Sequence, residues 1–129
     1  MCSVGVVMAD NPDDLLNRTR QFSLDVIAFL KTLPTEEPGP TVQRQLAKAA
    51  TGVSANYRAA RRSRSHAEFT SRISVVAEEA DESQHWLDLS TSTHLSTSPA
   101  LPNLLQESKE LTAIFSAMVG TARFNQRTR

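Results

Sequence analysis

The chain has 129 residues, which is the size of one domain with a single core. Aromatic residues make up only 5% and glycines number 4, fewer than the strands and turns of a β-rich protein usually need. The 14 basic and 14 acidic side chains cancel, so any contact with nucleic acid must come from local charge. A single cysteine, Cys2, excludes an internal disulfide framework and favours a reducing, cytoplasmic setting. No run is apolar and long enough to span a membrane.

The first predicted helix begins at Asn11-Pro12-Asp13-Asp14, where an N-cap precedes a proline at N1 and acids that the helix dipole favours. Residues 1–10 come before this signal, and we expect them to form a flexible tail that is dispensable for stability. One face then carries positions spaced by three and four residues, namely Leu15, Thr19, Phe22, Val26, Phe29 and Leu33. Prolines and a glycine at 34–40 mark the connection to the next helix.

The second and third predicted helices repeat this period. The second has its stripe at Val42, Leu46, Ala49, Val53, Asn56 and Ala60, with Tyr57 beside it. Ser65-His66-Ala67-Glu68 has the form of a capping box, which starts the third helix. The third stripe is Phe69, Ile73, Val76, Ala80, Ser83 and Leu87, and it ends in a Ser/Thr-rich run at 90–98.

A fourth helix is predicted to open at Ser98-Pro99, with Pro102 in its first turn. Its stripe is Leu104, Ser108, Leu111, Phe115, Met118 and Ala122. Four amphipathic helices with short connections predict an all-α, antiparallel up-down four-helix bundle, a single domain over residues 11–124. Residues 125–129 would form a short C-terminal tail.

The central block resembles the four-helix bundle family that is encoded in 23S rRNA intervening sequences. The resemblance is carried by QLAKAATGVSANYRAA at 45–60, by Arg62-Ser63-Arg64-Ser65 and Glu68-Phe69, and by EEADES at 78–83 followed by Trp86-Leu87. Phe22, Val26-Ile27 and Leu33-Pro34 fit the family's first helix, and Ala113-Ile114-Phe115 its last. The chain departs from the family at one point, because Gly52 and Ser54 have exchanged places. A contact that needs glycine at position 54 is therefore in doubt.

This resemblance implies a bundle that assembles as a ring-like homopentamer. It also implies a relation to the accessory protein of diversity-generating retroelements, which binds a reverse transcriptase and nucleic acid. Most members of the family have no established biochemical role.

An arginine cluster surrounds the turn between the second and third predicted helices. Its members are Arg58, Arg61, Arg62, Arg64 and Arg72, with His66 nearby. At about 100° per residue, Arg58, Arg61 and Arg62 lie opposite the apolar stripe of their helix. These residues are candidates for a nucleic-acid site, because guanidinium groups bind phosphate in a bidentate manner. The alternative is a solvated face, or one that is paired with the acidic block at 78–82.

Residues outside the main stripes predict a contact between subunits. The outer face of the second helix carries small residues, including Thr51 and Ser54, which would let another helix approach closely. The third helix places Val75, Trp86 and Leu89 away from its stripe. These apolar groups favour an oligomer interface over a monomer that exposes them to water.

Nothing in the sequence supports catalysis or a cofactor. Glu82-Ser83-Gln84-His85 has the Glu-x-x-His form of di-iron bundles, but it occurs once and faces away from the stripe, so we expect no metal. Asn56 is expected to bond to Glu79 or Asp81 across the bundle and to fix its register.

The favoured hypothesis is a non-enzymatic oligomeric binding module that contacts RNA or DNA, or an RNA-handling protein such as a reverse transcriptase. The alternative is a purely structural or protein-interaction scaffold that binds no nucleic acid.

Overall fold

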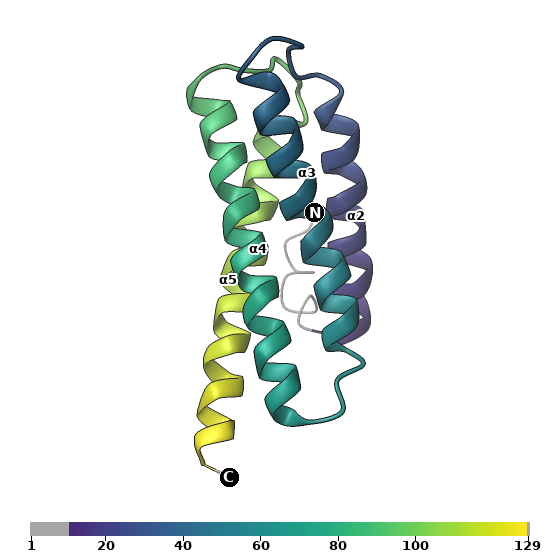
Figure 1. The fold of residues 1–129 in the computed structure, drawn as a ribbon, viewed down its shortest axis with the longest axis vertical. Helices are drawn as coiled ribbons and strands as arrows, with labels where there is room; N and C mark the ends of the chain where they lie inside the picture. Colours follow the sequence, from purple (N-terminus) through teal and green to yellow (C-terminus); the bar gives the residue numbers. More distant parts are fainter. Residues whose placement is uncertain (1–10, 129) are drawn as a thin grey trace.

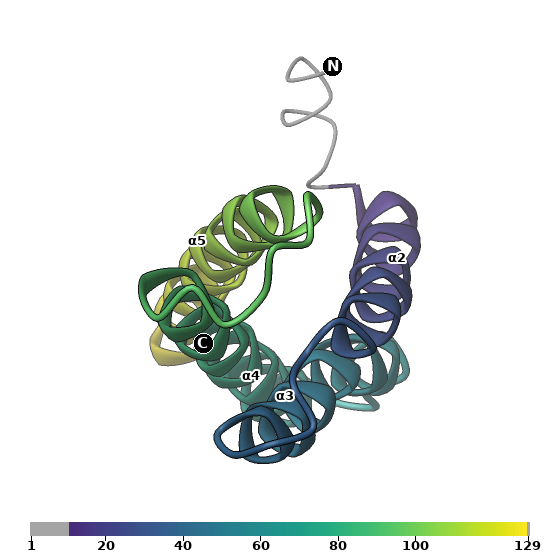
Figure 2. The same cartoon turned by 90° about the horizontal axis from the view of Figure 1, so that it is seen from above.

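The computed structural model describes residues 11–128, and these form four helices joined by short turns (Figure 1). The helices are α2 (Pro12–Leu30), α3 (Gly39–Ala60), α4 (His66–Ser92) and α5 (Leu101–Arg127). They run alternately up and down, and seen along the bundle they surround one core (Figure 2). The predicted all-α four-helix bundle is confirmed. No helix in this part of the chain is both long and apolar enough to cross a membrane.

Two of the predicted helix starts, those of α2 and α4, are formed by the residues that the sequence indicated. The Asn11 side chain accepts hydrogen bonds from the main-chain N–H groups of Asp13 at 2.9 Å and Asp14 at 3.4 Å. Ser65 Oγ accepts from the N–H of Glu68 at 3.0 Å. Each bond satisfies an N–H group that has no partner inside its helix, which is why these side chains fix where α2 and α4 begin.

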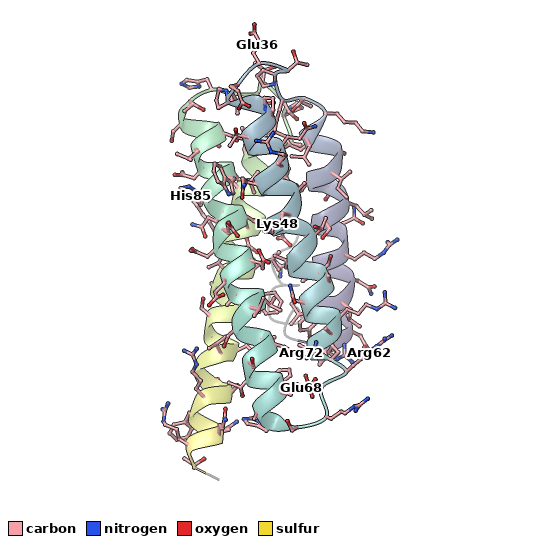
Figure 3. The ribbon with its side chains drawn as sticks, viewed as in Figure 1. Glu36, Lys48, Arg62, Glu68, Arg72 and His85 are labelled. Atoms are coloured by element: carbon pink, nitrogen blue, oxygen red, sulfur yellow. The ribbon has the colours of Figure 1, made fainter. Side chains whose placement is uncertain are left out.

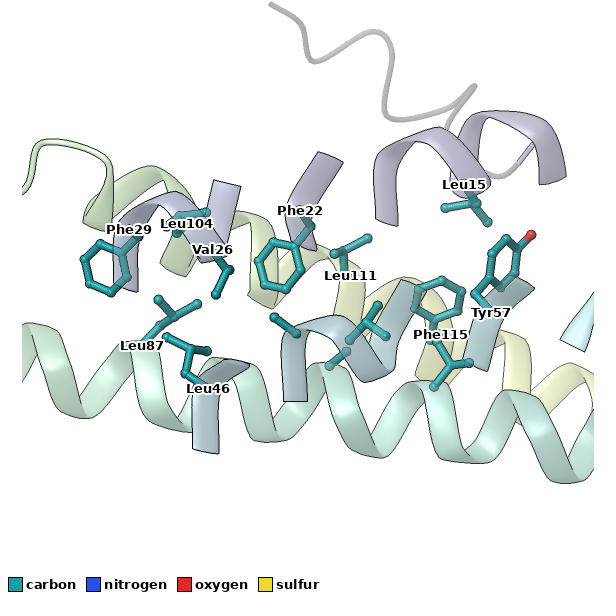
Figure 4. Close-up of a cluster of buried hydrophobic side chains, with 14 of the residues drawn as sticks. Leu15, Phe22, Val26, Phe29, Leu46, Tyr57, Leu87, Leu104, Leu111 and Phe115 are labelled. Carbon is teal, nitrogen blue, oxygen red and sulfur yellow. The ribbon is translucent and has the colours of Figure 1, made fainter. Parts of the chain in front are cut away.

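The core follows the predicted stripes closely (Figure 4). Burial of a leucine or phenylalanine side chain of this kind contributes about 1.5–3 kcal/mol each. Tyr57 and Phe115 pack with their ring centroids 5.3 Å apart. Large side chains buried between the helices include Leu15, Phe22, Val26, Phe29, Leu46, Ile73, Leu87, Leu111 and Phe115.

Asn56 was predicted on the core stripe, and the structure corrects this position. Tyr57 is only 2% exposed and takes the core place, four residues after Val53. Asn56 is half-buried, and its Nδ2 donates to the carbonyl oxygen of Gly52 at 2.8 Å within the same helix. The predicted bond to Glu79 or Asp81 is therefore wrong, because the Asn56 amide bonds to the i−4 carbonyl of its own helix.

The ends of the elements also differ from the prediction. α2 ends at Leu30, so Leu33 lies in the following turn and is half-buried. α5 begins at Leu101 rather than at Ser98-Pro99. It continues to Arg127, so most of the expected tail at 125–129 is helical. Val119 is buried where Met118 was expected. The predicted tail at 1–10 and Cys2 lie outside the described residues.

Packing is uneven around the bundle. α4 packs extensively against both α3 and α5, whereas the side between α2 and α5 has the fewest close approaches. An ion-pair network closes this side: Arg18 donates to Glu107 through Nε at 2.7 Å and Nη2 at 2.8 Å, and to Glu110 at 2.7 Å. Hydrogen bonding to Glu107 is the largest effect on Arg18 and raises its pKa. The network therefore ties the first helix to the last.

Candidate nucleic-acid interface

The arginine cluster forms at one end of the bundle, where α3 ends and α4 begins (Figure 3). The antiparallel course of the chain brings the first turns of α2 to the same end (Figure 1). Two adjoining surface hollows lie there, and Arg58 and Arg62 line both. All five predicted residues line one or both hollows, although they come from two helices and a turn.

The first hollow lies between α3 and α4 and holds a carboxylate of the chain itself. It is lined by Ala55, Arg58, Ala59, Arg62, Arg64, Glu68 and Arg72. Glu68 Oε2 accepts from Arg72 Nε at 2.9 Å, and Oε1 accepts from the main-chain N–H of Arg64 at 3.0 Å. The main-chain bond from Arg64 lowers the pKa of Glu68, and Arg72 adds to this effect. This hollow therefore already stabilises an anion.

The second hollow lies between α2 and α3. It is lined by Leu16, Asn17, Arg20, Ser54, Ala55, Arg58, Arg61 and Arg62. Arg20 is a basic residue that sequence reasoning missed, because its nearness to α3 arises from helix packing and not from spacing along the chain. The signal that could have found it is topological: in an antiparallel pair, the start of α2 must lie beside the end of α3.

Most of the arginines in the two hollows are free to bind an external anion. Arg61 pairs with Asp13 at 3.3 Å, and Arg72 pairs with Glu68. Within residues 11–128, no ion pair involves the other four, which are Arg20, Arg58, Arg62 and Arg64. No pair links the cluster to the acidic block at 78–82 in that range either. Salt bridges to that block therefore do not explain these arginines.

The predicted oligomer contacts divide into two groups. Val75 and Leu89 are 37% and 38% exposed on α4, as the prediction requires. Trp86 is half-buried against the core, and within the described chain its Nε1 is buried without a hydrogen-bond partner. On α2, Leu24 and Ile27 are two further exposed apolar residues, which were not predicted as contacts.

Of the two small residues that were predicted on the outer face of α3, Ser54 requires a correction. Thr51 is half-buried, and its hydroxyl donates to the carbonyl of Ala47 at 2.7 Å in its own helix. Ser54 was predicted on the outer face, but its Oγ lies 2.7 Å from Ser23 Oγ of α2. Ser54 therefore helps to pack two helices of one chain.

Gly52 and Ser54, the two exchanged residues, contact different neighbouring helices of the bundle: Gly52 faces Glu79 of α4, and Ser54 faces Ser23 of α2. At position 52, a Cβ would lie 2.7 Å from Glu79 Oε2, so glycine leaves room for that carboxylate. At position 54, the serine hydroxyl meets Ser23, and Ser23 also donates to the carbonyl of Ala50 at 2.8 Å. Glycine at 54 is thus not needed for this contact. Burial raises the pKa of Glu79, and the neighbouring Glu82 raises it further.

Over the part of the chain that the structure describes, no group of three or more His, Cys, Asp or Glu side chains could hold a metal ion. His85 of the Glu-x-x-His motif packs edge-on against Trp86, with the two ring centroids 4.9 Å apart. The chemistry that the arginine cluster offers is anion binding by guanidinium groups.

Comparisons with known proteins agree with the resemblance in the sequence. Residues 13–117 match the sequence model of the family described as 23S rRNA-intervening sequence protein. The fold is similar to the crystal structure of a protein of unknown function from the S23 ribosomal protein family of Bacteroides thetaiotaomicron, with a TM-score of 0.75. The two chains are 21% identical over 84% of this chain and 97% of the other. No curated protein matches the sequence.

Proposed function

The chain belongs to the 23S rRNA-intervening sequence protein family, and we propose that it is a non-enzymatic, oligomeric binding module that contacts the phosphates of RNA or DNA through its arginine cluster. The observation that carries the proposal is the convergence of Arg20, Arg58, Arg62 and Arg64, none of them ion-paired within residues 11–128, on two adjoining hollows. Guanidinium groups in this number favour a polyanion over a single charged ligand.

Oligomerisation would strengthen a site that is weak in one subunit. The net charge of the chain is zero, so a single copy has no long-range attraction for phosphate. An assembly such as the homopentamer would repeat the hollows at high effective concentration, and avidity would then raise the affinity without new contacts. The exposed side chains of Leu24, Ile27, Val75 and Leu89 supply apolar surface for such an assembly.

The test is a fluorescence-anisotropy titration with labelled single-stranded RNA and duplex DNA at two salt concentrations. We expect sequence-tolerant binding that falls steeply with salt, because released counterions supply its free energy. Arg62→Ala should weaken binding while the fold survives, because the side chain is exposed. The matched control is Arg44→Ala, an exposed arginine near the other end of α3. Loss of the same charge there should have little effect.

Two outcomes would contradict the proposal. One is no binding at low salt from a protein that light scattering shows to be well above 14.2 kDa. The other is equal weakening by Arg62→Ala and Arg44→Ala, which would indicate general charge attraction and not a site.

A second function is favoured by the exposed apolar side chains alone. A protein-interaction scaffold would use Leu24, Ile27, Val75 and Leu89 to bind other proteins, and the arginines would serve only for solvation. Capture of partners from the native host, with and without nuclease, separates the two functions. A partner such as a reverse transcriptase that stays bound after nuclease treatment, together with no anisotropy signal, would favour the scaffold.

A further inference from the structure

The two hollows at the arginine cluster differ in what already occupies them. In the hollow between α3 and α4, the Glu68 carboxylate accepts hydrogen bonds from the Arg72 guanidinium and from the Arg64 main-chain N–H. A phosphate that binds there must compete with Glu68 for these donors. The negative charge of Glu68 also opposes a second anion in the same space.

Within residues 11–128, the hollow between α2 and α3 has no carboxylate in its lining. Four arginines line it. Only one of the four is paired, since Arg61 contacts Asp13, whose side chain is highly exposed. Ser54 and Ala55 are small, so a phosphate can approach α3 closely between the guanidinium groups.

Arg58, near the end of α3, and Arg62, in the turn that follows α3, line both hollows and so lie at the boundary between them. Arg20 stands across from these two arginines on α2, exposed and without an ion pair in the described chain. A phosphate in the α2–α3 hollow would thus have guanidinium groups on two sides.

We infer that the α2–α3 hollow is the main phosphate contact and that Arg20 is one of its binding residues. The α3–α4 hollow binds phosphate more weakly, because Glu68 competes there for the same donors. The inference rests on the proposed function and deepens it. It adds α2 to an interface that the sequence places on α3 and α4 alone.

The experiment measures how the affinity for labelled duplex DNA depends on salt, in full-length protein. Each phosphate that a basic side chain neutralises contributes about 0.9 to the slope of log K against log salt. Arg20→Ala should therefore lower the slope by about 0.9 for each subunit whose hollow contacts the DNA, and weaken binding by at least about fivefold at low salt. Arg44→Ala removes the same charge outside the hollows and should leave the slope unchanged.

Glu68→Gln is the second variant, and it should raise the slope modestly by freeing Arg72 for phosphate. The inference is overturned if Arg20→Ala behaves like Arg44→Ala in a protein that binds. It is also overturned if Glu68→Gln raises affinity strongly while Arg20→Ala has no effect, which would make the α3–α4 hollow the main contact. Absence of any binding by the unchanged protein would instead refute the proposed function itself. Thermal melting of each variant checks that the fold is intact.

Discussion

Gly52 gives the sharpest test of how α3 packs against α4. Glycine within a helix is less favourable than alanine by about 1 kcal/mol, so Gly52→Ala gains that amount from helix propensity alone. The added Cβ would lie 2.7 Å from Glu79 Oε2 and 2.8 Å from its Cδ. These atoms are the far end of a flexible side chain, which can rotate away from α3. The sign of the substitution therefore depends on what this movement costs.

The surroundings of Glu79 indicate that the cost is small. Burial and the nearby Glu82 raise the pKa of the carboxyl, which means that its charged form is disfavoured in this place. Moving it into water relieves part of that penalty. We therefore expect Gly52→Ala to stabilise the protein by about 0.5–1 kcal/mol.

Urea denaturation of paired variants isolates the contact. Gly120→Ala is the control, because it lies inside α5 and a Cβ there meets nothing within 4 Å. It reports the propensity gain by itself, about 1 kcal/mol. The difference in stability change between Gly52→Ala and Gly120→Ala is the cost of displacing Glu79. In a Glu79→Ala background this cost is absent, so Gly52→Ala should there stabilise the protein as much as Gly120→Ala does. A loss of stability in Gly52→Ala that exceeds about 0.5 kcal/mol would refute the reasoning, because it would mean that Glu79 is held firmly against α3.

Three further predictions concern stability. Arg18→Ala should destabilise the fold by about 1–3 kcal/mol in urea denaturation, because it removes the partner of the Glu107 and Glu110 carboxylates. The control Arg20→Ala removes an exposed arginine and should change the stability little. Equal effects of the two substitutions would contradict this. Glu79→Gln should raise the melting temperature at pH 7 but not at a pH below the usual glutamate pKa of about 4.3. The reason is that a carboxyl whose pKa is raised in the folded state makes the protein less stable as the pH rises above the unfolded-state pKa. A gain in melting temperature that persists at about pH 3.5 would exclude this cause. Gly39→Ala should destabilise by more than about 2 kcal/mol, since its Cβ would overlap the rigid main-chain carbonyl of Pro34, and unchanged thermal melting would show that the turn can shift.

Much of the fold could be predicted because burial in a bundle repeats with the helical period. The N-cap at Asn11 and the cap at Ser65 are local, so a few residues suffice to place them. The choice between the neighbouring positions of Asn56 and Tyr57, about 100° apart on the helix, is harder, since both lie near the edge of the stripe. Packing settles it, because the Tyr57 ring fills space against Phe115.

The site was predictable only where its residues are close in sequence. Arg58, Arg61, Arg62 and Arg64 lie around one turn and could be grouped directly. Arg20 meets them only through the packing of α2 on α3. Ser54 was misplaced for the same reason: a small polar residue beside the stripe is compatible with an outer face, and only its bond with a residue 31 positions earlier shows which helix it meets.

The Arg18 network also bears on how the chain is made. Glu107, which accepts hydrogen bonds from Arg18, lies 89 residues further along the sequence than Arg18. At ordinary synthesis rates of about 5–20 residues per second, roughly 4–18 s separate the appearance of the two side chains on the ribosome. α2 can dock on α3 soon after both have emerged, but Arg18 has neither of its carboxylate partners until α5 has been made. The side of α2 that faces α5 is thus open to other chains during this interval, before the helix that closes it has been made.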